Sequence, residues 1–313
     1  MTVKKDDTHT RPGWRPMSGF PGNLDSPPPA GRARAEFGAC SRRGPLRATN
    51  DDHYLILQLG RQQETVLTSL PEGAVPTHFE EFAYGMVIAD GTGRAAETAS
   101  RLAITTLAHL AVHFGKWNVR INEPIAEEVM DRAERFYKNV DSTLVQAGRG
   151  SPAGLQTTLT AAYTAGNELF FAYVGDSPAY ILRDGQLLRL TRDPSLEKER
   201  PSPVWIFDVA AGAPDLNYLV SDTLGGAGPA RPRVNVERCG LLDGDLILLC
   251  TNGLTDVVDD GRIADMLRLH PTPDEQCRAL VDLADRSGGY DDVTVLITHY
   301  HLGKEPDCAR RLP

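Results

Sequence analysis

The chain has 313 residues, of which 41% are hydrophobic and 24% charged, a balance typical of a globular protein with a buried core. Its net charge of -9 argues against nucleic acid or an anionic membrane surface as partner, because both favour a basic face. The five cysteines are scattered and form no CxxC pair, which argues against a zinc site or a disulfide framework. No apolar run reaches the length of a membrane span, so we expect a cytoplasmic protein with no membrane association.

The first half of the chain predicts a tail followed by strands and two long helices. Residues 1–35 are rich in Pro, Gly and Arg and lack periodicity, so we expect a disordered tail before a domain at 36–302, with a short C-terminal tail at 303–313. Apolar runs at 54–59 and 82–89 predict strands. Apolar residues at helical spacing predict a helix over 95–114, and Pro124 with acidic residues in the first turn predicts another over 124–147.

The second half is richer in β-type residues. Short apolar runs separated by Gly-Asn, Gly-Asp and Asp-Gly turns predict an antiparallel meander of strands at 157–165, 168–174, 179–182 and 187–190. Residues 192–218 are interrupted by prolines and are expected to form a flap. The remaining elements are a strand at 245–250, helices at 263–269 and 277–284, and a closing strand at 293–299. This order favours an α+β fold over regular βαβ alternation.

Acidic residues recur where predicted strands begin or end. Asp51-Asp52, Asp90, Asp176 and Asp291-Asp292 each stand beside a predicted β segment. Mg²⁺ and Mn²⁺ bind oxygen ligands, and two such ions about 4 Å apart can activate a water for attack on phosphorus. A single acidic pair in a turn is more often a cap or a solvated loop, so the order of the pairs along the chain carries the argument.

Seven segments, in order, resemble the motifs of the PPM-type (protein phosphatase 2C) family and together cover about residues 36–300. They are Arg47-Ala-Thr-Asn-Asp-Asp52, Asp90-Gly-Thr-Gly93 with Glu97-Thr-Ala-Ser100, Leu155-Gln-Thr-Thr158, Val174-Gly-Asp-Ser-Pro-Ala-Tyr180, Leu190-Thr-Arg-Asp-Pro-Ser195, Leu248-Leu-Cys-Thr-Asn-Gly-Leu-Thr-Asp256 and Gly289-Tyr-Asp-Asp-Val-Thr-Val295. The resemblance implies a four-layer α/β/β/α sandwich of two antiparallel sheets flanked by helix pairs. It also implies metal-dependent hydrolysis of phosphoserine and phosphothreonine in proteins by a hydroxide that bridges two metal ions.

The resemblance also implies a role for each site residue. One Mg²⁺ or Mn²⁺ ion would be held by Asp51, Asp90 and the carbonyl of Gly91. Asp90 would bridge to a second ion, which Asp291 and residue 252 support. Two further residues would act without contacting a metal ion: Arg47 would bind the substrate phosphate, and Asp52 would orient metal-bound water.

Departures from the family pattern leave two interpretations open. Asn252 stands where the family has a metal-binding Asp, so the second ion should bind weakly, and Gly154 stands near the place of a third-metal Asp. Asp51 is one methylene shorter than the family's Glu. We favour an active phosphatase with a weakened metal site. The alternative is a pseudophosphatase that binds phosphoproteins or regulatory partners without turnover.

Partner expectations follow from the resemblance: a phosphoprotein substrate, for example a Ser/Thr kinase of the same cell, acted on by a monomer. A competing interpretation rests on Gly91-x-Gly93-x-x-Ala96, a partial dinucleotide-binding fingerprint. That fingerprint requires an acidic residue about 20 positions later, and residues 98–122 contain none. We therefore place a dinucleotide enzyme well behind the phosphatase.

Overall fold

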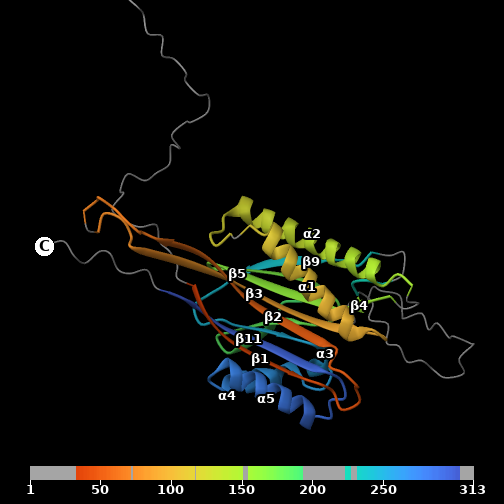
Figure 1. The fold of residues 1–313 in the computed structure, drawn as a ribbon. Coiled ribbons are helices and arrows are strands. Elements are labelled where there is room, and N and C mark those ends of the chain that lie inside the picture. Colours follow the sequence, from red (N-terminus) through yellow and green to blue (C-terminus); the bar gives the residue numbers. More distant parts are fainter. Residues whose placement is uncertain are drawn as a thin grey trace, which may run out of the picture. The chain divides into compact units, whose positions relative to one another are not determined.

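The computed structural model describes residues 33–71, 73–116, 118–150, 154–192, 223–226 and 231–303. These residues belong to one compact unit, Gly31–Lys304. Within them the chain forms two antiparallel sheets and two groups of helices (Figure 1). The predicted flap at 192–218 lies outside the described residues except for Arg192, and so does nearly all of both predicted tails.

The first sheet has five strands in the order β1-β11-β10-β7-β8. Their bounds are β1 Ala33–Arg42, β11 Val293–Leu302, β10 Leu246–Cys250, β7 Ala179–Arg183 and β8 Gln186–Arg189. The second sheet has the order β2-β3-β5-β6-β9, with β4 paired to the end of β3. Its bounds are β2 Asp52–Glu64, β3 His78–Thr92, β5 Leu159–Ala165, β6 Glu168–Val174, β9 Asn235–Gly240 and β4 Gln156–Thr157.

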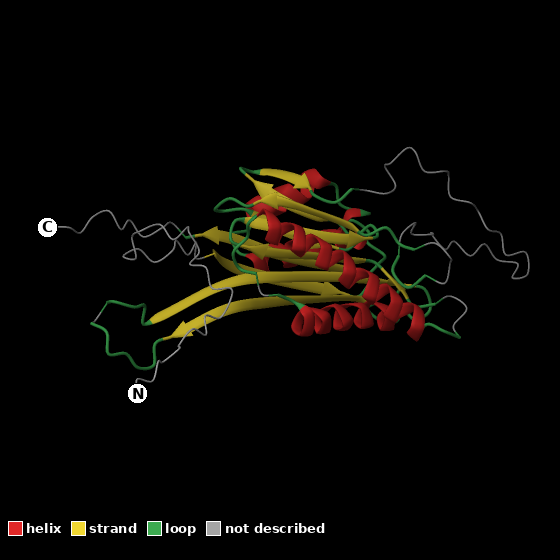
Figure 2. Cartoon of the chain, turned by 90° about the horizontal axis from the view of Figure 1, so that it is seen from above, coloured by secondary structure: helices red, strands yellow, loops and turns green. Residues whose placement is uncertain are grey.

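Helices cover the outer face of each sheet, and the two sheets pack face to face (Figures 1 and 2). Helices α1 (Ala96–Phe114) and α2 (Glu123–Ala147) pack on the second sheet. Helices α3 (Asn252–Thr255), α4 (Asp260–Leu269) and α5 (Pro273–Arg286) follow β10 in the chain, and side chains of all three join the core on the outer face of the first sheet. This arrangement confirms the predicted four-layer sandwich.

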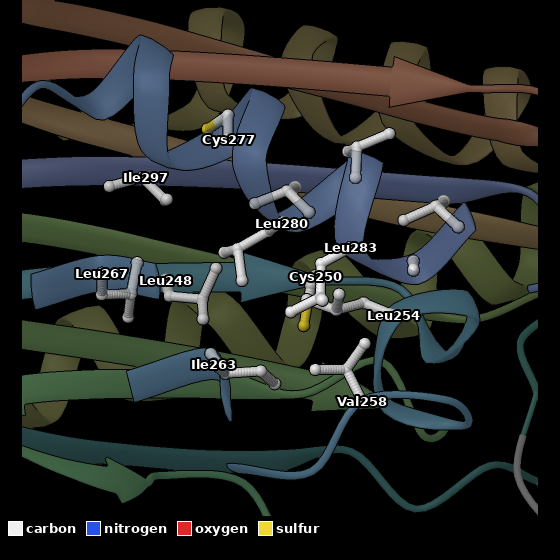
Figure 3. Packing of buried hydrophobic residues seen from close by; sticks show 14 of the residues in the cluster. Leu248, Cys250, Leu254, Val258, Ile263, Leu267, Cys277, Leu280, Leu283 and Ile297 are labelled. Atoms are coloured by element: carbon white, nitrogen blue, oxygen red, sulfur yellow. The ribbon is translucent and has the colours of Figure 1, made fainter. Parts of the chain in front are cut away.

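Three apolar layers hold these elements together: one between the sheets, one under α1 and α2, and one under α4 and α5. Between the sheets, Met86 and Ile88 of β3 meet Ile247 and Leu296 of the first sheet. Beneath α4 and α5, Leu267 and Leu280 pack with Leu248, Cys250 and Ile297, as Figure 3 shows. Alternate residues of each central strand therefore face opposite apolar layers, which explains why these strands read as continuous apolar runs in the sequence.

The two long helices were predicted to within one residue at either end. Asn122 precedes α2, and its side chain accepts a hydrogen bond from the Ile125 amide at 3.1 Å. Pro124 follows in the first turn, where its missing amide hydrogen costs nothing. Local capping chemistry thus fixes the start of α2 before tertiary packing contributes.

The predicted meander is wrong. Strands β5 and β6 are paired, but β7 and β8 belong to the other sheet, so the chain crosses between sheets after Val174. Gly175 makes the crossing with φ of 104°, and a side chain there would lie 2.6 Å from a methyl carbon of Thr158. The turn was recognised from its Gly-Asp pair, but its geometry breaks the sheet instead of forming a hairpin.

Two strands and one break were not predicted from the sequence. Strands β1 and β9 are edge strands with mostly half-exposed, mixed polar residues, so they lack the apolar run of a central strand. The last three residues of the predicted tail begin β1 at Ala33. The strand predicted over 157–165 is divided at Thr158 into β4 and β5.

Candidate functional site

Strand pairing brings the predicted site residues to one end of both sheets. In the second sheet Asp52 of β2 pairs with Asp90 of β3, and the Gly91 amide donates to the Asp51 carbonyl at 3.1 Å. In the first sheet Cys250 pairs with Val295, which places the residues after β10 beside those before β11. The Thr251 amide donates to the Thr294 carbonyl at 3.0 Å across this junction. Four chain segments, two from each sheet, therefore meet at a single edge, where the Asp51 amide donates to Asp292 Oδ2 and Thr251 Oγ1 donates to Asp52 Oδ2.

Gly91 lies where a side chain cannot fit. It is buried in β3 beside the start of α1, and an added Cβ would lie 2.0 Å from the Ala96 carbonyl oxygen. The close approach of α1 to the strand end therefore requires glycine at this position.

Arg47 and Asp291 form a two-pronged ion pair. Arg47 Nε donates to Asp291 Oδ1 at 2.7 Å, and Nη2 donates to Oδ2 at 2.8 Å. A second carboxylate, that of Asp51, lies 3.8 Å from Arg47 Nη1. The predicted phosphate ligand thus lies between two predicted metal ligands, and its planar fork matches a carboxylate as well as it would match a phosphate.

Asp292 positions the loop that carries Arg47 and Asp51. It is buried, and its two carboxylate oxygens accept the backbone amides of Gly44 and Asp51, each at 2.7 Å. Sequence reasoning noted the Asp291-Asp292 pair but assigned a role only to Asp291. Doubled acidic residues at a strand start were the available signal, and the structure divides them between Arg47 pairing and loop positioning.

Asp52 is enclosed beneath the site. Thr251 Oγ1 donates to its Oδ2 at 2.9 Å, whereas Oδ1 is buried and has no hydrogen-bond partner among the described residues. Burial raises the pKa of Asp52 to about 7, while the hydroxyls of Thr294 and Thr251 act in the opposite direction. The hydroxyl of Thr294 in turn lies 2.7 Å from that of Ser41, so a chain of hydroxyls supports this carboxyl group.

Asp90 is buried among other carboxylates of the site. Burial raises its pKa well above the usual range, and the charge of Asp52 raises it further. The carboxylates of Asp291 and Asp176 contribute in the same direction, while Arg47 partly offsets them. Such mutual repulsion means that these groups lie close together and would be relieved by a bound cation.

Asn252 begins α3 and faces Asp176. Its Nδ2 donates to Asp176 Oδ2 at 3.5 Å, and its Oδ1 is buried with no hydrogen-bond partner in the part of the chain that the structure describes. The amide therefore presents an oxygen donor in the place where a carboxylate would add charge. Asp176 was noted in the sequence as one of the recurring acids but received no site role, and the structure places it against Asn252.

The oxygen atoms of this site suit a hard divalent cation, although they are not arranged as a complete set of metal ligands. One buried oxygen each on Asp52 and Asn252 has no hydrogen bond from the described residues, and burial together with neighbouring carboxylates raises the pKa of Asp90. Among the described residues no three His, Cys, Asp or Glu side chains are already arranged to hold a metal ion. The Arg47–Asp291 pair gives a physical reason, because it turns one predicted ligand toward a guanidinium.

A histidine pair was overlooked in the sequence. His109 and His113 stand four residues apart on exposed positions of α1, with ring centroids 4.2 Å apart. No third ligand of the usual kinds joins them within the described part of the chain.

Among the described residues, no helix is both long and apolar enough to cross a membrane.

No family model matches the sequence. The chain is 31% identical over 233 residues to the serine/threonine protein phosphatase PstP of Mycobacterium tuberculosis, and the match covers 72% of this chain and 43% of PstP. It thus spans less than half of that relative's length. It is 30% identical over 223 residues to the serine/threonine phosphatase stp of Listeria welshimeri, covering 69% of this chain and 84% of the relative.

Solved structures show the same fold. The catalytic domain of PstP, crystallised in complex with two manganese ions, superposes with a TM-score of 0.60 at 27% identity, covering 86% of this chain and 99% of that domain. A serine/threonine phosphatase of Streptococcus agalactiae gives a TM-score of 0.64 at 23% identity over 85% of this chain. Sequence identity of 30% over most of a relative's length, together with this common fold, means that the chain belongs to the PPM-type (protein phosphatase 2C) family of serine/threonine phosphatases.

Proposed function

We propose that the chain hydrolyses phosphoserine and phosphothreonine in proteins with the aid of Mg²⁺ or Mn²⁺. The observation that carries the proposal is the meeting of Asp51, Asp90 and Asp291 with Arg47 at one edge of the two sheets. Carboxylates supply the oxygen ligands of divalent cations, and a guanidinium supplies a phosphate contact. The two manganese ions in the PstP catalytic domain support the same assignment.

Each residue has a proposed task. Asp51, Asp90, the carbonyl of Gly91, Asn252 and Asp291 would hold the cations. When bound, divalent ions acidify water and neutralise phosphate charge. Arg47 would leave Asp291 and bind two phosphate oxygens, an exchange of one bidentate partner for another.

Asp52 would accept and release a proton beside the reacting groups. Burial raises the pKa of its carboxyl to about 7, and one oxygen receives no hydrogen bond from the residues that the structure describes. A carboxyl poised near neutrality can accept a proton from water on attack and release it later. Thr251 holds the other oxygen and so fixes the orientation of the group.

Asn252 sets the expected weakness of the site. An amide oxygen keeps one donor but lacks a full negative charge, so one of two ions should bind less tightly than the other. We expect millimolar Mn²⁺ or Mg²⁺ to be needed for full occupancy. The proposed substrates are phosphoproteins, with a Ser/Thr kinase of the same cell as one candidate, and we expect the protein to act as a monomer in the cytoplasm.

A pseudophosphatase is the second candidate, and two observations favour it. Asn252 replaces a charged ligand, and Arg47 is committed to Asp291 within the described structure. If the ion pair outlasts metal addition, the same edge would recognise partners without turnover. Both candidates use the same surface and differ in whether divalent ions displace Arg47 from Asp291.

Hydrolysis assays separate the two candidates. Purified protein would be given a phosphothreonine peptide and p-nitrophenyl phosphate while Mn²⁺ and Mg²⁺ are titrated, with Asp90→Ala as the inactive control. Metal-dependent phosphate release that is lost in Asp90→Ala supports the phosphatase. A folded protein that releases no phosphate at any metal concentration supports the pseudophosphatase.

A further inference from the structure

A cavity lies between the helix pair and the second sheet, away from the candidate site. Its volume is about 160 Å³, and its lining comes from α1, α2, the two residues after α1, and strands β2, β3, β5, β6 and β9. Figure 1 shows α1 and α2 lying over these strands. Gly85 marks its position on β3, five residues from Asp90 and therefore about 17 Å along the strand.

The cavity exists because small side chains face one another across the two layers. The sheet contributes Gly85, Ala161 and Ala172, and the helices contribute Ala108, Ala111 and Ala133. The cavity is partly open to solvent, so a ligand can enter it, and its apolar lining lacks the close contacts of a packed protein interior. Cavities of about 150 Å³ lined by apolar side chains take up molecules the size of benzene.

Both charged side chains among the described lining residues are basic. They are Arg132 of α2 and Lys116, which follows α1. Lys116 is exposed, whereas the side chain of Arg132 is only 10% exposed. A cavity with apolar walls and a cationic end has the complement of an anionic amphiphile.

Arg132 is poorly neutralised for a buried guanidinium. Its Nη1 lies 3.4 Å from Glu128 Oε1 and its Nη2 lies 3.5 Å from the Lys116 carbonyl, both at the long limit of a hydrogen bond. Glu128 is shared, because Lys116 Nζ lies closer to the same oxygen, at 2.7 Å. Burial also lowers the pKa of Arg132, so its charge would gain from a better partner.

We propose that this cavity binds a monocarboxylate with an apolar body of about six or seven carbons, because a cavity of this volume takes up a benzene-sized molecule. The apolar body fills the space above Gly85 and Ala161, and the carboxylate pairs with Arg132, with Lys116 at the rim. A guanidinium fork accepts a carboxylate in a bidentate pair that its present contacts do not supply. This site is separate from the proposed phosphatase centre and does not depend on it.

Calorimetric titration of metal-free protein tests the proposal with octanoate as the probe. We expect one octanoate per chain with a dissociation constant on the order of 0.1–1 mM, given the small number of ligand atoms. Octanol lacks the charge and acetate lacks the tail, so both should bind at least about tenfold more weakly. Octanol binding as tightly as octanoate would overturn the role of Arg132.

Variants test the location. Ala133→Leu fills the cavity and should abolish octanoate binding while leaving the melting temperature unchanged or higher. Arg132→Met should weaken octanoate binding at least about tenfold. Lys116→Gln, at the exposed rim, should weaken it less and serves if Arg132→Met fails to fold. No octanoate binding to wild type, or binding that Ala133→Leu leaves intact, would overturn the proposal.

Discussion

The guanidinium of Arg47 donates two hydrogen bonds to the carboxylate of Asp291, of 2.7 and 2.8 Å. Arg47 is the proposed phosphate ligand and Asp291 a proposed metal ligand, so the charge of each is now neutralised by the other. Loading the site must separate them, and the side chain of Arg47 is exposed enough, at 39%, to swing outward. This exchange links metal binding to substrate binding through a single contact.

Replacing Arg47 should therefore have opposite effects on the two ligands. Arg47→Ala should lower kcat/KM for a phosphothreonine peptide roughly 10–100-fold, the value of a charged bidentate contact. It should also lower the metal concentration for half-maximal stabilisation, because Asp291 is released. Arg47→Lys keeps the charge without the fork and should fall between the two proteins. Metal affinity that is unchanged in Arg47→Ala would show that the ion pair does not compete with the cation.

Asn252→Asp should reverse its effect on stability when metal is added. Without metal, a new carboxylate beside Asp176 and near Asp90 should lower the melting temperature by like-charge repulsion. With Mn²⁺ the same carboxylate should raise it above wild type and reduce the half-saturating Mn²⁺ concentration about tenfold. Thermal melts across a Mn²⁺ series would measure both effects, with the exposed substitution Asn139→Asp on α2 as control. Equal shifts in the two variants would mean that residue 252 is not a ligand.

Asp292 should be needed for stability as well as for the site. Asp292→Ala leaves the amides of Gly44 and Asp51 without their acceptor and should cost about 2–4 kcal/mol of unfolding free energy. Asp292→Asn keeps one acceptor oxygen and should cost about half as much. Urea unfolding measures both, and phosphopeptide KM should rise in step as the Arg47 loop loosens. An Asp292→Ala variant with the unfolding free energy of wild type would refute the positioning role.

The metal-free protein should lose stability as pH rises from about 4 to 7. Burial raises the pKa of Asp52 from 3.8 to about 7, so within this window the folded state holds a proton that the unfolded state has released. Asp52 alone should therefore lower stability by roughly 2–4 kcal/mol as pH rises, and the raised pKa of Asp90 should extend the loss to higher pH. Asp52→Asn should make the profile less steep in the window between the unfolded and folded pKa of Asp52. Stability that increases across this window in wild type would contradict the assignment.

Sequence periodicity was enough to find the central elements of the fold. Strand β6 and helices α1 and α2 carry their own signals, an apolar run or a capped amphipathic stripe, and were placed almost to the residue. Edge strands β1 and β9 carry no such signal, because one side of each makes no strand pairing and their side chains stay half exposed. The sheet crossing at Gly175 depends on contacts with Thr158, which lies 17 residues earlier in the chain.

The candidate site shows the same division. The order of the motifs along the chain predicts that Asp51, Asp90 and Asp291 come together. Strand pairing aligns them within each sheet, and the contacts of Arg47 and Asp292 join the two sheets there. The partners of each side chain could not be predicted, because they depend on loops that fold back over long sequence separations. The link from Asp292 to Gly44 and the pairing of Arg47 with Asp291 both span more than 240 residues.

Binding of Mn²⁺ to the purified protein, followed by electron paramagnetic resonance, tests the central claim most directly. The account predicts two classes of bound ion, one weaker because of Asn252, and loss of both in Asp90→Asn. The exposed substitution Asp131→Asn on α2 should leave binding unchanged. Mn²⁺ that stays free in the presence of wild-type protein, or that binds Asp90→Asn as well as wild type, would contradict a metal centre at this edge of the sheets.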